Sequence, residues 1–288
     1  MKIHKLLPKI HIHPIVFAFL LISVVTGMFV EMLIILSIVL IHEFGHYAAA
    51  TYFRWRIRKV MLWIFGGVME TDEHGNRPLY EDIVVTLAGP FQHLLIYGFV
   101  FIISFFSIIP ASIIDLILLY NTTILLFNLL PIYPLDGGKL LFFLLSARLP
   151  YQRAYYNILL ISMVLCSLIA IIQIVFYPFT LSALLIMIFL FIENHAAWKK
   201  RYYVFLRFLI NRYKGNGTLK LMRPITVPYQ DSLMDVFSRF RRDYKHPIYI
   251  EVQDDKRLFI DEFDCLRCYF HEKQYDKSVG EIAKYIAT

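Results

Sequence analysis

Lys and Arg are missing from three long segments of the 288-residue chain, 10–53, 78–138 and 154–198. The three segments are 44 to 61 residues long. A helix that crosses a membrane needs about 20 apolar residues, so each segment has room for two such helices and a turn. The chain is 58% apolar and only 18% charged, which excludes a disordered, collagen-like or disulfide-stapled protein. The sequence therefore predicts a polytopic α-helical membrane protein.

A natural break lies near the middle of each segment, at Gly27, Pro110 and Pro178. Each segment is therefore expected to form a helical hairpin, and three hairpins give six transmembrane helices. Their expected ranges are 11–30, 32–53, 82–107, 113–135, 154–176 and 179–196. All basic residues lie on one side of these spans, and the positive-inside rule makes that side cytoplasmic. We therefore expect an integral, multi-pass protein with both termini in the cytoplasm.

The apolar run Val60–Gly67 is too short to cross a bilayer. It belongs to a loop at 54–80 that is expected to be cytoplasmic. The run is predicted to be a strand or a re-entrant hairpin that lies against the helices. It has two interpretations of equal weight, a buried anchor for the loop and a strand that pairs with an extended substrate.

The composition changes at residue 199, after which the chain supplies +6 of its net charge of +7. We expect a membrane domain at 1–198, a basic linker helix at 199–217 suited to anionic lipid, and a small cytosolic α/β module at 218–288. The expected elements of the module are a helix at 233–242, a strand at 246–252 and a second helix at 263–270. Its basic residues are expected to form a solvent-exposed face, so no direct binding of nucleic acid is expected.

The second expected span contains His42, Glu43 and His46 in the pattern His-Glu-x-x-His. Such groups inside a span cost several kcal/mol on the lower published scales, so they need a partner or a function. The two His residues lie four apart on one helical face, where both imidazoles can bind one metal ion. Glu43 can then reach a water on the metal without being a ligand. The competing interpretation is a structural cluster of polar residues between helices.

A catalytic zinc ion usually has a third protein ligand and an open fourth position. The acids within the expected spans are Asp115, Asp136 and Glu193. Asp136 follows two prolines that should break the helix, and broken backbone at this depth is tolerated beside a cavity or within protein. Capping or snorkelling explains Asp115 and Glu193, which lie near span ends. His93 is a further candidate ligand, although a polar lining of the cavity explains it better.

These motifs resemble those of the site-2 protease family of intramembrane zinc metalloproteases. The resemblance rests on His42-Glu43-x-x-His46, Phe65-Gly66-Gly67, Glu73 to Leu79, Ala88-Gly89-Pro90 and the run from Asn128 to Gly138. It extends to the branch of the family that processes a pro-sigma factor during sporulation. By this resemblance one zinc ion is held by His42, His46 and Asp136, and Glu43 is the general base. Asn128 is implied to hold the substrate or the oxyanion.

The resemblance also implies partners and a location. A pro-sigma factor would be the protein substrate, other membrane proteins would inhibit the enzyme, and the enzyme would lie in the mother-cell membrane around the forespore. The run Met222 to Phe237 resembles the opening of a cystathionine-β-synthase (CBS) module. Such modules usually pair to bind ATP or another adenine nucleotide. Since one copy is visible, binding would need two chains, and a structural or dimerising role explains the module nearly as well.

Two other functions are compatible with intramembrane metal ligands. A metal transporter or metal sensor would line an ion path with them, but the intramembrane acids cluster toward one side instead of forming a chain across the bilayer. An inactive scaffold would not need a complete set of metal ligands and a general base. Cys265 and Cys268, with His271 nearby, could bind zinc, but no second Cys pair exists, so free thiols are expected. Cys166 is expected to be an apolar filler.

Overall fold

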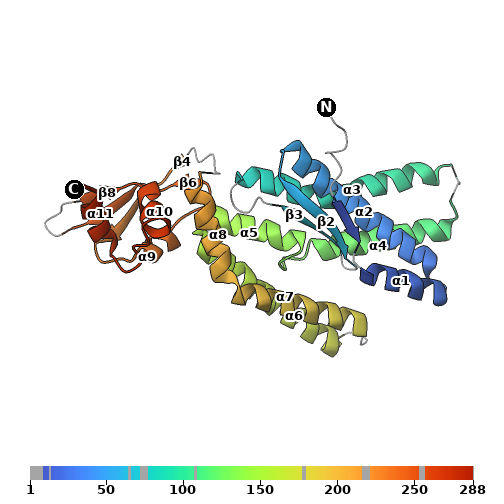
Figure 1. Cartoon of the computed structure of the whole chain (residues 1–288). Coiled ribbons are helices and arrows are strands. Elements are labelled where there is room, and N and C mark those ends of the chain that lie inside the picture. The colour runs from blue at the N-terminus through green and yellow to red at the C-terminus, as the bar shows by residue number, and fades with distance from the viewer. Residues whose placement is uncertain are drawn as a thin grey trace. The chain divides into compact units, whose positions relative to one another are not determined.

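The structure is a computed structural model that describes residues 9–12, 14–63, 66–71, 77–106, 109–176, 180–215, 221–252 and 257–287. Its contacts divide the chain into two compact units. The first unit consists of Met1–Glu73, Tyr80–Pro131 and Leu135–Gly137, and the second consists of His74–Leu79, Ile132–Pro134 and Gly138–Thr288. Figure 1 labels the helices and some of the strands of both units.

The first unit combines helices with a small sheet. Its helices are α1 (Pro14–Val25), α2 (Phe29–Tyr52), α3 (Leu79–Ser104) and α4 (Ala111–Asn128). The sheet has the order β1 (Lys9–Ile12), β2 (Ile57–Trp63) and β3 (Gly66–Thr71). Strand β1 pairs parallel with β2, β2 pairs antiparallel with β3, and β3 lies beside α2. The hairpin predicted at Val60–Gly67 is therefore confirmed, apart from residues 64 and 65, which lie outside the described residues.

Five helices in the described part of the chain are long and apolar enough to cross a membrane. They are α2, α3, α4, α6 (Tyr151–Phe176) and α7 (Leu181–Lys199), and they correspond to the second through sixth predicted spans. The first predicted span, 11–30, contains α1, which has only 12 residues. Such a helix is about 18 Å long, whereas the hydrocarbon core is about 30 Å thick. The first span, and with it the total of six, therefore stays a prediction.

The outer surface of the long helices is apolar, and apolar side chains also pack between the helices. Phe99 and Phe101 on α3 are each more than half exposed. On the same helix, Ile96 and Val100 are buried in a cluster with Ile38 of α2. A surface of this kind is favourable against lipid tails and costly against water, so it agrees with an integral membrane protein.

The second unit contains nearly all of α5 (Asp136–Arg148), together with α6, α7, α8 (Arg201–Tyr213) and a C-terminal module. The module contains β4 (Leu221–Met222), β5 (Ile225–Pro228), α9 (Leu233–Ser238), β6 (Tyr244–Lys245), β7 (Ile248–Glu251), β8 (Arg257–Ile260), α10 (Glu262–Phe270) and α11 (Val279–Ala287). In its main sheet β5 is parallel to β7, and β7 is antiparallel to β8. The predicted helices and strand correspond to α9, α10 and β7, so the α/β character is confirmed.

Helix α8 forms where the basic linker helix is expected, and protein covers part of its apolar face. Phe205, Phe208 and Leu209 on this face are buried by protein. The ring of Tyr151, at the start of α6, stacks on Phe208 with 4.1 Å between centroids, and α8 also contacts α10. The suitability of this basic helix for anionic lipid stays a prediction, and the buried part of its apolar face is covered by protein.

The C-terminal module packs on the turn between α5 and α6 within the second unit. The backbone N–H of Tyr151 donates to the carbonyl of Phe240 at 2.9 Å. The buried guanidinium of Arg242 lies over the ring of Phe143 on α5 and donates to the carbonyl of Arg77 at 3.1 Å. These contacts join residues before position 199 to residues after it. The domain boundaries at 198 and 217 stay predictions.

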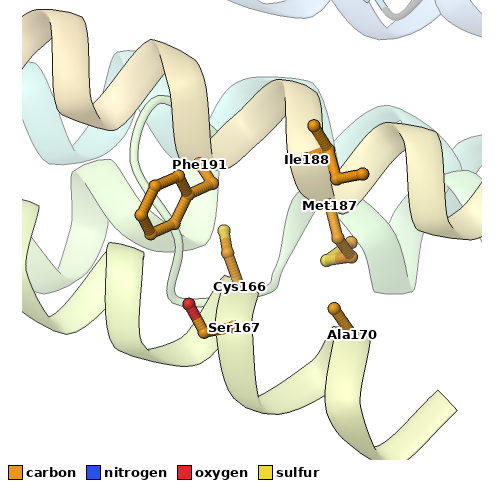
Figure 2. A pocket seen from close by; sticks show the side chains of 6 residues that line it. All are labelled: Cys166, Ser167, Ala170, Met187, Ile188 and Phe191. Atoms are coloured by element: carbon orange, nitrogen blue, oxygen red, sulfur yellow. The ribbon is translucent and has the colours of Figure 1, made fainter. Parts of the chain in front are cut away.

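A cavity of about 190 Å³ lies between α6 and α7. Figure 2 shows the side chains that line it, which are Cys166, Ser167, Ala170, Met187, Ile188 and Phe191. The lining contains no carboxylate and no imidazole, so it lacks the groups that hydrolysis or metal binding needs. Cys166 is buried among apolar side chains here, which agrees with its expected role as a filler.

Candidate metal centre

Helix α2 presents two imidazoles from one buried face. His42 and His46 are four residues apart, so both side chains lie over the same turn of the helix. Both residues are buried, and their Nε2 atoms are 3.1 Å apart. The spacing His-x-x-x-His thus produces the convergence that the sequence predicts.

Asp136, the first residue of α5, completes the cluster. Its Oδ2 atom lies 3.1 Å from Nε2 of His42 and 3.1 Å from Nε2 of His46. Each of the three residues offers one donor atom, and all three atoms lie within 4.8 Å of one another. Among the three acids weighed from the sequence, Asp115 and Glu193 are exposed and lie outside this cluster.

The donor set fits a zinc ion. Zinc in proteins is bound by imidazole nitrogens and carboxylate oxygens at about 2.0–2.2 Å, and a tetrahedral arrangement separates neighbouring ligand atoms by about 3.3 Å. The observed separations are 3.1 Å along each of the three sides. Three protein ligands would leave the fourth position for water or substrate, as in catalytic zinc sites.

Gly89 on α3 allows this helix to approach the two imidazoles. A Cβ atom at residue 89 would lie 2.3 Å from Nε2 of His46 and 2.8 Å from Cε1 of His42, which is closer than Cβ atoms are found. Gly137 plays a similar part beside Asp136, since a Cβ there would lie 2.1 Å from the carbonyl oxygen of Leu129. Both glycines belong to motifs that carry the family resemblance.

The outer ring nitrogens of both His residues have hydrogen-bond partners. Nδ1 of His46 lies 2.8 Å from the carbonyl oxygen of Val85. A carbonyl oxygen can only accept, so Nδ1 of His46 carries the proton and Nε2 presents a lone pair to the cluster. Nδ1 of His42 lies 3.0 Å from Nε2 of His93, which is itself buried. His93 thus lies behind a candidate ligand and lines the site as a polar group.

The chain is broken between α4 and α5, as its prolines predict, and side chains satisfy the exposed backbone. In the second unit the N–H of Tyr133 donates to Oγ of Ser162 on α6 at 2.8 Å. The carbonyl of Tyr133 accepts from Nδ2 of Asn194 on α7. Ser162 and Asn194 are fully buried. Sequence reasoning missed both, and the available signal was a lone polar residue on an apolar helix.

Glu43 lies on α2, the helix that carries His42 and His46, and Asn128 lies on α4, the helix that precedes Asp136 in the sequence. Glu43 is buried beside His42 on α2. Asn128 is the last residue of α4, and its Nδ2 donates to the carbonyl of Ile124 at 3.0 Å. Their catalytic roles stay predictions.

The pair Cys265 and Cys268 on α10 forms no second metal cluster with other ligands in the described residues. Both are buried free cysteines. Burial raises the pKa of the Cys268 thiol to about 11, which keeps it protonated at neutral pH. Neither cysteine forms a disulfide, and the expectation that the pair binds no zinc stays a prediction.

Comparison with known proteins identifies the class of enzyme. Residues 30–111 and 108–169 match peptidase family M50. The chain belongs to this family, the site-2 proteases, and it is a zinc metalloendopeptidase. It is 40% identical to stage IV sporulation protein FB of Bacillus subtilis over 278 residues, which are 96% of each chain.

Two comparisons with Methanocaldococcus jannaschii agree with this assignment, one in sequence and one in fold. A zinc metalloprotease of Methanocaldococcus jannaschii is 29% identical over 174 residues, which cover 59% of this chain and 48% of that protein. The solved structure of a site-2 protease from M. jannaschii is similar in fold, with a TM-score of 0.53 and 23% identity. That similarity covers 65% of this chain and 89% of the solved one. The resemblance stated from the motifs is confirmed, and membership favours a protease over a transporter or scaffold.

Proposed function

We propose that the chain is an intramembrane protease whose single zinc ion is held by His42, His46 and Asp136. The observation that carries this proposal is the convergence of three buried donor atoms within 4.8 Å. Zinc bound by these residues would lower the pKa of a bound water toward neutrality and polarise the scissile carbonyl. The other steps of hydrolysis fall to side chains of the protein.

Glu43 is the proposed general base. It follows His42 directly on α2, and both residues are buried. The carboxylate accepts a proton from the attacking water and afterwards returns it to the leaving amine. A carboxylate that is not itself a ligand can change its protonation state while the ligand set is unchanged.

Asn128 is the proposed donor to the substrate carbonyl. One N–H of its amide is used by the carbonyl of Ile124. The same nitrogen carries a second N–H, which can donate to the carbonyl oxygen of the substrate as negative charge develops there. A donor of this kind is often worth about 3 kcal/mol in the transition state.

The substrate peptide must be extended at the cleaved bond, because a helix holds its carbonyls in hydrogen bonds. Strand β3 is proposed to pair with this extended segment. Two observations support the idea. In the described sheet β3 has a strand neighbour on only one side, β2, and β3 lies beside α2, which carries two of the proposed ligands.

The proposed substrate is a membrane-associated pro-sigma factor that is cleaved near the cytoplasmic face. The B. subtilis relative is named as a sporulation protein, and this name supports the proposed substrate and a place in the mother-cell membrane around the forespore. The positive-inside pattern supports six spans with cytoplasmic termini. Control by inhibitory membrane proteins is part of the same proposal.

The C-terminal module is proposed to be CBS-like and to bind ATP or another adenine nucleotide as a pair from two chains. Support comes from the succession β5, α9, β7, β8 and α10, with β5 parallel to β7 and β7 antiparallel to β8. Ser232 begins α9 with a capping box, which agrees with the turn and helix cap read from the sequence. A dimerising role without nucleotide is the simpler form of this proposal.

Cleavage of candidate precursors by the purified full-length protein tests the proposed function. Cleavage should stop when a chelator removes the metal and resume when zinc is returned. Glu43→Gln should lower the rate by about 10²–10⁴-fold, because the base is lost. The same variant should keep one zinc ion per chain. Undiminished cleavage by Glu43→Gln, or cleavage that survives metal removal, would contradict the mechanism.

A further inference from the structure

A line of hydrogen bonds runs from His42 through two further helices of the first unit. Nδ1 of His42 lies 3.0 Å from Nε2 of His93 on α3. Nδ1 of His93 lies 2.7 Å from Oδ1 of Asn121 on α4. Nδ2 of Asn121 in turn donates to the backbone carbonyl of His93 at 3.2 Å. His93 and Asn121 are both completely buried.

The direction of each hydrogen bond follows from its neighbours. The carbonyl of His93 can only accept, so it must face the NH₂ group of Asn121, and this fixes the orientation of the amide. Oδ1 of Asn121 therefore faces the His93 ring and accepts from Nδ1–H. A neutral ring protonated on Nδ1 accepts through Nε2, so Nδ1–H of His42 donates to it. The remaining nitrogen of His42, Nε2, then presents its lone pair to Asp136 and His46.

We propose that His93 and Asn121 are positioning residues for the metal centre. They hold His42 in the one tautomer, and at the one ring orientation, that can bind a metal through Nε2. The proposal rests on the proposed function, since it assumes that His42 is a ligand. Outer partners of metal-bound imidazoles typically change metal affinity by 10–100-fold.

The two proposed ligands on α2 differ in what orients them. His46 donates to the backbone carbonyl of Val85, and no side-chain substitution can remove that acceptor. His42 depends on side chains from α3 and α4. The affinity of the centre for metal can therefore be changed by substituting the side chains that orient His42, without altering any ligand.

A second polar pair provides a matched control. The hydroxyl of Tyr97 lies 2.7 Å from Oγ1 of Thr122, so this pair also joins α3 to α4, one residue further along α4 than Asn121. The hydrogen bonds of this pair join Tyr97 to Thr122 and Thr122 to the carbonyl of Leu118, and neither residue belongs to the cluster of His42, His46 and Asp136. Tyr97→Phe thus removes a link between the same two helices and keeps the His42 partner.

The test measures zinc affinity of the purified full-length protein by competition with a chelator, and the absorption spectrum of the Co²⁺-loaded protein. His93→Leu should weaken zinc binding by about 10–100-fold and change the Co²⁺ spectrum. His93→Gln should bind more tightly than His93→Leu, because an amide can accept from His42 and donate to Asn121. Tyr97→Phe should match the unsubstituted protein.

Each result decides between the two proposals. If the unsubstituted protein binds no zinc, or His42→Ala binds it equally well, the proposed function fails. If zinc is bound but His93→Leu binds within twofold of the unsubstituted protein, the positioning role is overturned and the metal centre stands. The positioning role is also overturned if Tyr97→Phe weakens binding as much as His93→Leu, or if His93→Gln binds no better than His93→Leu. Should His93→Leu not fold, unchanged affinity in Asn121→Leu would overturn the role equally.

Discussion

The buried polar cluster in which Arg212 of α8 binds the C-terminal module differs in kind from the membrane cluster, which consists of His42, His46 and Asp136. Arg212 donates to both carboxylate oxygens of Glu262, at 2.6 and 2.8 Å. His246 donates to the carbonyl of Arg223 and accepts from the backbone N–H of Arg241, each at 2.8 Å. Every one of these contacts joins a donor to an acceptor, so the cluster is complete without any added ion.

The membrane cluster is assembled from groups of one kind. Its facing atoms are two imidazole nitrogens and a carboxylate oxygen, each 3.1 Å from the other two. In the tautomers set by Val85 and His93 these facing atoms are acceptors, and acceptors at such distances repel one another unless a cation lies between them. The comparison shows that burial of charge alone does not mark a site. The balance of donors and acceptors separates a structural cluster from a binding one.

Loss of a ligand in the membrane cluster should have the largest effect. Asp136→Ala removes the only carboxylate in the cluster, so the zinc content is expected to fall from one ion per chain toward none and cleavage to be lost. Metal analysis of the purified protein after dialysis measures the change. Asp115→Ala, which removes an exposed acid from α4, is the control and should keep its zinc. Full zinc content in Asp136→Ala would make that residue structural.

Loss of a partner in the module should reduce stability and leave the metal unaffected. Glu262→Leu leaves the buried guanidinium of Arg212 without its carboxylate, which typically costs about 3–5 kcal/mol. Hydrogen exchange over residues 221–287 of the full chain should show a matching fall in the free energy of opening. Asp264→Ala, which breaks a half-exposed pair with Arg267, should change it by less than about 1 kcal/mol. Loss of zinc in Glu262→Leu would break the contrast.

Loss of a hydrogen bond to the segment between α4 and α5 should reduce stability by an intermediate amount. Asn194→Leu removes the donor to the carbonyl of Tyr133, and a buried acceptor without a donor costs about 1–3 kcal/mol. Thermal unfolding of the detergent-solubilised protein should show this loss. Gln173→Leu, at an exposed bond to Thr180, serves as the control and should be nearly neutral. Equal stability of the two variants would mean that water or lipid replaces the lost donor.

Acid should weaken the module through His246, with the smallest of the four effects. Burial lowers the pKa of this imidazole below its ordinary value of 6.5, so the unfolded chain binds a proton more readily than the folded one. The stabilising contribution is therefore present above about pH 6.5 and is lost as the pH falls through the folded value. Proteolysis of the module at about pH 7.5 and about pH 5.5 measures it. His246→Gln should flatten the dependence, and an equally steep dependence in that variant would assign it to other groups.

The parts of the site that sequence reasoning could predict are those set by local spacing. His42 and His46 converge because residues four apart share a helical face, and Asp136 stands out because acids are scarce in apolar segments. The long helices follow from apolar length in the same way. No knowledge of distant contacts is needed for either inference.

The parts that could not be predicted depend on pairings between distant segments. Asn121 meets His93, and Asn194 meets Tyr133, only after the helices have packed, and no period in the sequence encodes those partners. Likewise β1 pairs with β2 across more than 40 residues, and hydropathy alone assigned its residues partly to the first span. The apolar face of α8 shows the same limit, since hydropathy does not distinguish lipid from protein as its cover.

Asp136 occupies the first turn of α5, where the backbone N–H groups of a helix point outward and carry partial positive charge. The carboxylate therefore has favourable electrostatic surroundings that the protein itself provides. The backbone of α5 thus offsets part of the negative charge of Asp136, so that less of the compensating charge has to come from a bound cation.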